Sequence, residues 1–182
     1  MDDFVEVLRL VCRYLNDHDM TYVMVGGIAV MYHGVPRTTV DIVFILKLDD
    51  HEIEQFTTFL NSENFDVSKK DLADALREGT HCTVFVGDGL LRLDLQGISS
   101  EFDEMTLERR ISVEFAGVQM YIGSAEDTII NKILFQGEQD LRDARGILVR
   151  NEEDLDHAYI EMMCKKLGIY EDWIEFKENH PL

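Results

Sequence analysis

The sequence predicts an α/β protein in which a short mixed β-sheet flanked by helices is followed by a helical C-terminal part. Three observations support this fold class. Short β-branched and aromatic segments alternate with helical patterns in the first two thirds of the chain. Glycine-containing turns join two pairs of these segments, and from Ser124 onward only helical periodicity remains. We therefore expect a core over residues 1–123 and a helical segment over residues 124–182 packed on it.

The first half of the chain alternates helices with strands. An amphipathic helix opens it, because apolar residues recur there at helical spacing. A short buried strand then stops at Gly26 and Gly27, a helix with small residues follows, and Asp41 begins a strand typical of the centre of a sheet. Two further helices come next. In chain order, we expect these elements at about residues 4–15, 21–25, 28–34, 41–46, 50–60 and 71–76.

Two hairpins and four helices complete the predicted fold. The first hairpin spans residues 81–97 and turns at Gly-Asp-Gly, and the second turns near Ala-Gly at residues 116–117. In the second strand of the first hairpin, Asp94 alternates with leucines and points away from them. Ser124 and Asp127 form a capping box ahead of the first helix, and Gly168 ends the third.

Length and charge limit the classes of function. A chain of 182 residues suits one domain of average size, or a core with a small helical appendage. The net charge of -19, from 36 acidic and 17 basic residues, repels phosphate backbones, so broad nucleic-acid binding is not expected. A small anionic substrate escorted by Mg²⁺ remains compatible with this charge. The acidic residues equally suit a solvated surface or a patch for a basic partner.

The cysteines and the apolar segments indicate a cytoplasmic protein. Cys12, Cys82 and Cys164 are odd in number and far apart, which favours a reducing compartment. His81 beside Cys82 has no second pair at zinc spacing, so a zinc site is not expected. The first twenty residues resemble neither a signal nor a transit peptide, and no apolar run approaches the ~20 residues of a membrane span.

The segment GGIAVMYHGVPRTTVDIV, residues 26–43, carries the strongest functional signal. It is neither a Walker loop nor a G-x-G-x-x-G fingerprint. It resembles the nucleotidyltransferase superfamily, specifically small DNA polymerase β-like proteins, whose motif runs Gly-Gly-x-Ala, then Gly, then Arg-x-Thr-x-Asp-x-Asp. The match fails at Val43. It is carried by Gly26, Gly27, Ala29, Gly34, Arg37, Thr39 and Asp41.

Two later segments extend the resemblance over roughly residues 22–148. The strand LRLDLQG looks like the one that carries that family's third carboxylate, which would be Asp94. The segment from Ser124 to Leu148 is similar to the helical part of toxin-type and uncharacterised bacterial and archaeal members, with Lys132 on one helix and Asp140 and Asp143 on the next.

This resemblance implies a function and a set of site residues. The function would be transfer of a nucleoside monophosphate from an NTP to an RNA or protein hydroxyl. Asp41 and Asp94 would be the catalytic carboxylates and the ligands of Mg²⁺, which prefers such oxygens. An antitoxin or a second copy of the chain is a possible partner. The nucleotide-binding residues would be Gly26, Gly27, Arg37, Thr39 and Lys132.

Val43 stands where the family carries its second acid. Residues two apart on a strand share a face, so the missing carboxylate belongs beside Asp41, inside the predicted site. A single metal ion could still bind through Asp41, Asp94 and the phosphates of a nucleotide. Three hypotheses therefore stay open: an active Mg²⁺-dependent nucleotidyltransferase, a degenerate one that binds nucleotide or a partner protein without turnover, and an unrelated function.

Each predicted site residue also has an ordinary structural interpretation. The glycine pair could be a plain turn, Asp41 a turn or cap residue, Asp94 a solvated strand residue and Lys132 a solvated helix residue. His33 could cap the end of its helix. Methionines and aromatic residues near the C-terminus suit a core or a dimer seam. Charged residues on the second C-terminal helix could pair along its surface: Asp140, Arg142, Asp143 and Arg145.

Overall fold

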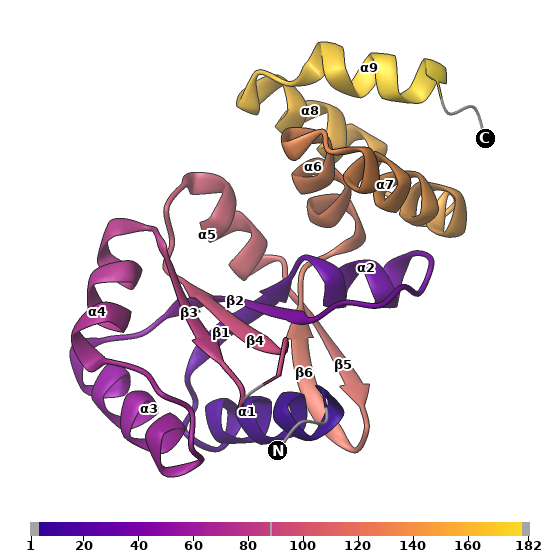
Figure 1. Ribbon diagram of the computed structural model, residues 1–182. Coiled ribbons are helices and arrows are strands. Elements are labelled where there is room, and N and C mark those ends of the chain that lie inside the picture. Colours follow the sequence, from indigo (N-terminus) through magenta and orange to yellow (C-terminus); the bar gives the residue numbers. More distant parts are fainter. Residues whose placement is uncertain (1–3, 88, 180–182) are drawn as a thin grey trace. The chain divides into compact units, whose positions relative to one another are not determined.

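The computed structural model describes residues 4–87 and 89–179 of the chain. It divides into two compact units. The sheet unit comprises the described residues up to Ile28 together with Thr38–Gly123, and the helical unit comprises Ala29–Arg37 with the described residues from Ser124 onward. The predicted α/β class is confirmed, since a mixed six-stranded sheet is flanked by helices (Figure 1).

The sheet unit contains all six strands, which are β1 (Thr21–Val25), β2 (Asp41–Lys47), β3 (His81–Phe85), β4 (Arg92–Gln96), β5 (Ile111–Phe115) and β6 (Val118–Ile122). Their order in the sheet is β3-β4-β2-β1-β6-β5. The pairs β2–β4 and β1–β6 are parallel, and the remaining pairs are antiparallel. The motif segment therefore runs from the end of central strand β1 to the start of central strand β2, and the prediction that β2 lies at the centre of the sheet is confirmed.

Both predicted hairpins are present. Strands β3 and β4 pair antiparallel, as do β5 and β6. Ala116 and Gly117 both have positive φ, 51° and 74°, which a tight hairpin turn of this kind requires. Asp88, in the predicted turn of the first hairpin, lies outside the described residues.

The two faces of the sheet differ in character. One face is apolar and fully buried: the rings of Tyr22 and Phe44 are tilted against each other with centroids 5.7 Å apart, and Met24 contacts Cys12 of helix α1 (Phe4–Asp17). Helices α3 (Asp50–Ser62) and α4 (Lys69–Glu78) pack against each other, and α4 also packs against β3 and β4. These three helices were predicted, and their observed bounds differ by only a few residues.

Helix α5 (Glu101–Glu108) was not predicted. Its Leu107 packs on Val23 and Ile45, on the face of the sheet opposite to the one that carries Tyr22 and Phe44. The helix is short and acidic, with too few apolar residues to show a helical period. The sequence does contain a capping signal, because Ser100 precedes Asp103 by three residues. In the structure the Ser100 hydroxyl accepts a hydrogen bond from the backbone N–H of Asp103.

The helical unit contains the end of α2 (Gly27–His33) and four further helices: α6 (Ala125–Phe135), α7 (Glu138–Asn151), α8 (His157–Leu167) and α9 (Tyr170–Asn179). The predicted capping of α6 is confirmed, because Ser124 Oγ accepts from the N–H of Asp127 at 3.1 Å. Gly168 ends α8 with a φ of 73°, as predicted. Trp173 and Phe176 are buried, so the aromatic residues of α9 pack in the core of this unit.

The end of α2 is fixed to α7. Asn151 Nδ2 donates a hydrogen bond to the carbonyl of His33 at 2.7 Å, and Arg150 Nη1 donates to the carbonyl of Gly34 at 2.9 Å. A Cβ on Gly34 would lie 2.9 Å from Ile147 Cγ1, so only glycine fits beside α7 at this position. Across the described residues, we find no helix both long enough and apolar enough to cross a lipid bilayer.

Candidate functional site

Four residues form a square on one face of the sheet unit. The parallel pairing of β2 with β4 places Asp41 opposite Arg92 and Val43 opposite Asp94. Alternate residues of a strand point to the same face, and paired residues on neighbouring strands share it. The residues between the corners of the square are fully buried on the other face. The sheet thus brings together the two carboxylates that the sequence predicts for the site.

Arg92 is the cation of this square. Its Nε lies 2.6 Å from Asp41 Oδ1 and 3.5 Å from Asp94 Oδ2. The contact with Asp41 is an ion pair and not a hydrogen bond, because the Nε–H does not point at the oxygen. The other oxygen of Asp94 accepts a hydrogen bond from Thr83 Oγ1 at 2.6 Å. Two carboxylates therefore share one guanidinium.

Val43 occupies the corner where the resemblance predicts an acid. It pairs with Val25 of β1 on one side and with Asp94 of β4 on the other. A Cβ on Gly26 would lie 3.5 Å from Val43 Cγ2, so this side chain adjoins the glycine turn. A methyl group thus stands between the turn and Asp94, where it can neither bind a cation nor accept a hydrogen bond.

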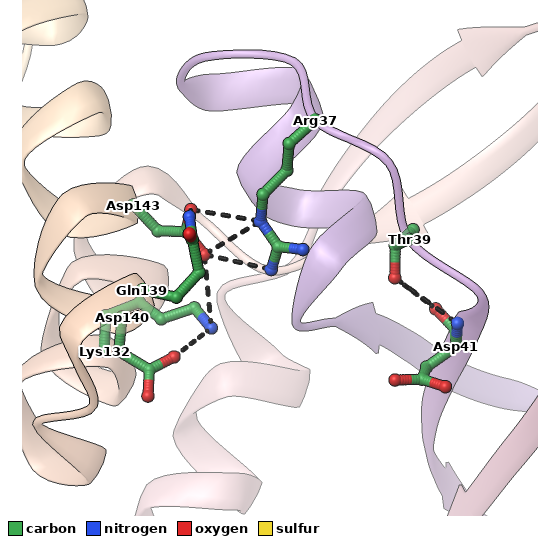
Figure 2. A network of polar contacts seen from close by, with 7 residues as sticks. All are labelled: Arg37, Thr39, Asp41, Lys132, Gln139, Asp140 and Asp143. Carbon is green, nitrogen blue, oxygen red and sulfur yellow. Dashed lines mark hydrogen bonds and ion pairs between the residues drawn. The ribbon is translucent and has the colours of Figure 1, made fainter.

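Glycine is required at positions 26 and 27 for two different structural reasons. Gly26 has a φ of 65°, in the left-handed region that favours glycine. A Cβ on Gly27 would lie 2.7 Å from Thr39 Oγ1, so any side chain there would collide with the loop. Thr39 Oγ1 in turn accepts a hydrogen bond from the backbone N–H of Asp41 at 3.3 Å (Figure 2). Glycine at position 27 thus allows Thr39 to fix the start of β2.

The helical unit holds a separate network of charged side chains. Arg37 donates to both carboxylate oxygens of Asp143, from Nε at 3.1 Å and from Nη2 at 3.0 Å, and Gln139 Nε2 donates to Asp143 at 2.8 Å (Figure 2). Lys132 Nζ lies 2.7 Å from Asp140 Oδ1 and 3.6 Å from Asp143 Oδ2. The Arg37 contact has the fork geometry that makes such pairs strong and directional.

Two ordinary interpretations are wrong: Lys132 is not a solvated helix residue, and Asp143 does not belong to pairs along the surface of its helix. Lys132 is 8% exposed and Asp143 is 5% exposed. Helices α6 and α7 pack together, so the carboxylates of α7 that face α6 meet its lysine. The interpretation holds for Arg142, which is exposed and pairs with Glu138 one turn earlier. Buried charges of this kind require partners, and each of them has one.

The square does not fit a divalent cation as it stands. In residues 4–87 and 89–179, no three His, Cys, Asp or Glu side chains are grouped so that they could hold a metal ion. Mg²⁺ requires about six oxygen ligands, and here Arg92 already contacts the two available carboxylates. The resemblance predicts an acid at position 43, which would have supplied a third oxygen ligand. Any metal ion bound to Asp41 and Asp94 would first have to displace the guanidinium.

Sequence reasoning overlooked the partners of the carboxylates. Arg92 and Asp94 lie two residues apart on one strand, which already places both on one face. The contact of Arg92 with Asp41 depends on the register between β2 and β4, and no local signal encodes it. Thr83, on the next strand, depends in the same way on the register of the hairpin. Gln139 carried no signal that separates it from other polar helix residues.

Comparison with known proteins identifies the fold. A family model described as a nucleotidyltransferase of unknown function matches residues 3–174 of the chain. No curated protein matches the sequence. Among solved structures, an antigenic nucleotidyltransferase-like protein from Paracoccidioides brasiliensis has a TM-score of 0.56 at 20% identity, over 79% of this chain and 74% of that one.

Two structures of one antibiotic-resistance factor are also similar. The solution structure of ANT(2'')-Ia has a TM-score of 0.60 at 11% identity, covering 99% of this chain and 100% of the other. The crystal structure of ANT(2'')-Ia in complex with adenylyl-2''-tobramycin has a TM-score of 0.51 at 13% identity, covering 96% and 97%. At such low identity these likenesses establish the fold alone, which agrees with the fold expected from the motif.

Proposed function

The chain belongs to a family of nucleotidyltransferases of unknown function, and we propose that it binds a nucleoside triphosphate without transferring its nucleotidyl group efficiently. The observation that carries this proposal is the square on the sheet. Val43 stands where the resemblance predicts an acid, and Arg92 pairs with the two acids that remain and offsets one of their two negative charges.

The phosphates of the nucleotide would bind at the turn formed by Gly26 and Gly27. A turn without side chains lets phosphate oxygens approach backbone N–H groups, and the hydroxyl of Thr39 lies beside it. Arg37 and Lys132 stay predicted phosphate ligands. Their present ion pairs within the helical unit would then have to open or be shared with phosphate.

Efficient transfer depends on charge that this site lacks. Negative charge develops on the transferred phosphoryl group and on the oxygens that attack and leave, and its electrostatic stabilisation supplies most of the rate. Removing a single group of this kind from an active site typically lowers the rate by about two to three orders of magnitude. Replacing an acid by Val43 removes the charge and leaves an apolar surface in its place.

A second candidate function is slow Mg²⁺-dependent transfer to an RNA or protein hydroxyl. It is favoured by one observation: Asp41 and Asp94 lie on the same face of two adjacent parallel strands. In this case both would serve as catalytic residues and metal ligands, and the protein could act as one half of a toxin–antitoxin pair. The cytoplasmic location stays part of either proposal, as does assembly with an antitoxin or a second copy of the chain.

Titration with each NTP separates the two candidates. Binding would be measured by calorimetry in EDTA and in Mg²⁺, and pyrophosphate release would be followed in the presence of total RNA and of cellular protein as acceptors. We expect affinities that agree within about threefold, since Arg92 already contacts both carboxylates, and no pyrophosphate above a blank. Binding that requires Mg²⁺ together with pyrophosphate release would establish the second candidate, and absence of binding under both conditions would overturn both.

A further inference from the structure

We propose that Arg92 is the resident cation of the candidate site, in that its guanidinium takes the place of a divalent metal ion at Asp41 and Asp94 and must leave them before such an ion can bind. The first support is position. Arg92 is the corner of the square that adjoins both acids, Asp41 across the strands and Asp94 along its own strand.

The second support is the form of the contact. Asp41 Oδ1 and Arg92 Nε are buried atoms, 2.6 Å apart, and neither has a hydrogen-bond partner among the described residues. A guanidinium usually meets a carboxylate through two parallel N–H bonds, as Arg37 meets Asp143 in the same chain. The Arg92 contact is held by charge without that fork geometry. It is therefore easier to exchange for another cation than the contact of Arg37.

The third support is the identity of residue 43. With an acid at this corner, three carboxylates would face one guanidinium, and a divalent cation would balance them better than Arg92 alone. With Val43, two carboxylates face one guanidinium and the residual charge is only one unit. Binding a divalent ion while Arg92 stays in place would set like charges within a few ångströms of each other, which is unfavourable even when partly screened.

The experiment measures Mn²⁺ binding to the full chain without nucleotide, by the loss of the free Mn²⁺ signal in electron paramagnetic resonance. Arg92→Gln should tighten binding by about tenfold or more, because the competing cation is removed. Arg92→Lys keeps the charge on a compact, strongly hydrated ammonium and should give an intermediate affinity. If Arg92→Gln does not fold, the affinity of Arg92→Lys for Mn²⁺ tests the proposal in its place.

Lys47 offers a matched control. It lies on β2 and pairs with an acid, Glu104, at 3.0 Å, so Lys47→Gln removes one positive charge from an ion pair of the same sheet unit. This change should leave Mn²⁺ affinity within about twofold of the starting protein, since an exposed pair outside the square contributes only long-range, screened charge. Equal tightening by both variants would show an effect of net charge alone and would overturn the proposal.

Two other outcomes would overturn it as well. One is equal Mn²⁺ affinity of the starting protein, Arg92→Gln and Arg92→Lys. The other is absence of Mn²⁺ binding to a folded Arg92→Gln. The inference rests on the proposed site but not on nucleotide binding. A negative Mn²⁺ result would not change the outcome of the NTP titration. A negative NTP titration would likewise not change the outcome of the Mn²⁺ measurement.

Discussion

Val43 stands directly opposite Asp94 in the parallel pairing of β2 with β4, and beside the turn formed by Gly26. A carboxylate at position 43 would therefore face both the remaining acid and the proposed phosphate site. The resemblance predicts an acid at this position, and residues 4–87 and 89–179 hold no group of three side chains that could bind a metal ion.

The change Val43→Asp should make NTP binding depend on Mg²⁺. It adds an oxygen ligand beside Asp94 on the face that carries Asp41, and we expect Mg²⁺ to strengthen NTP affinity by about tenfold. Val43→Asn, which has a similar shape without the charge, is the control and should show less than about threefold. Calorimetry with and without Mg²⁺ measures both. An unchanged affinity in Val43→Asp would mean that Asp41 is not at a metal site.

The change Asp143→Asn should destabilise the helical unit. It leaves Arg37 and the buried Lys132 short of one negative charge, and breaking a buried ion pair costs about 3 kcal/mol. Arg142→Gln removes an exposed charge from the same helix and should change the free energy of unfolding by no more than about 0.5 kcal/mol. Urea denaturation gives both values. Equal, small effects would show that the network does not stabilise the fold.

The change Gly27→Ala should destabilise the sheet unit. Its Cβ would lie 2.7 Å from Thr39 Oγ1, and such overpacking costs about 2 kcal/mol, more than alanine gains as a helix former. Gly117→Ala meets no atom within 4 Å, so only its left-handed backbone is strained, at about 1 kcal/mol. In the double variant Gly27→Ala with Thr39→Gly the collision disappears, so part of the lost free energy of unfolding should be recovered. Thermal unfolding of the three variants is the measurement.

The stability of the protein should fall between about pH 9 and pH 12. Burial raises the pKa of the Cys12 thiol from 9.0 to about 12 and that of Cys164 to about 11. Above pH 9 the unfolded chain releases protons that the folded chain retains, so the free energy of unfolding decreases as the pH rises. Urea unfolding at pH 8 and pH 10.5 should show this loss. The free energy of unfolding of Cys164→Ala should decrease less between pH 8 and pH 10.5 than that of the starting protein.

The same burial predicts an order of thiol reactivity. Cys82 is partly exposed and its pKa is raised by burial, whereas Cys12 and Cys164 are buried. A disulfide reagent at pH 8 should therefore modify Cys82 first, and the two buried thiols only in denaturant. Reaction of all three at one rate in the folded protein would contradict the packing around Cys12.

Local sequence patterns were sufficient for most of the elements. The apolar spacing of α1, the β-branched composition of β2 and the hairpin turn at Ala116 and Gly117 are all short-range signals, and the structure agrees with each. Helix α5 was not predicted because a helix of eight residues with three apolar side chains has too few turns to show a helical period. Its Leu107 is held by tertiary packing on Val23 and Ile45.

The candidate site was predictable only in part. The motif placed Asp41, and strand alternation placed Asp94 on the polar face of β4. The ion pair of Asp41 with Arg92 depends on the register in which β2 pairs with β4, and these two residues are 51 positions apart in the chain. In the same way, the burial of Lys132 depends on how α6 and α7 pack, since helical periodicity defines a face without saying what covers it.

The guanidinium of Arg92 means that the protein carries its own counter-ion. Proteins that rely on a structural metal lose their fold when a chelator removes it, because binding free energy is part of their folding free energy. Here the two carboxylates share the positive charge of one side chain of the same sheet, through contacts of 2.6 Å and 3.5 Å. We therefore expect protein purified in EDTA to keep its fold, with a free energy of unfolding unchanged by the chelator.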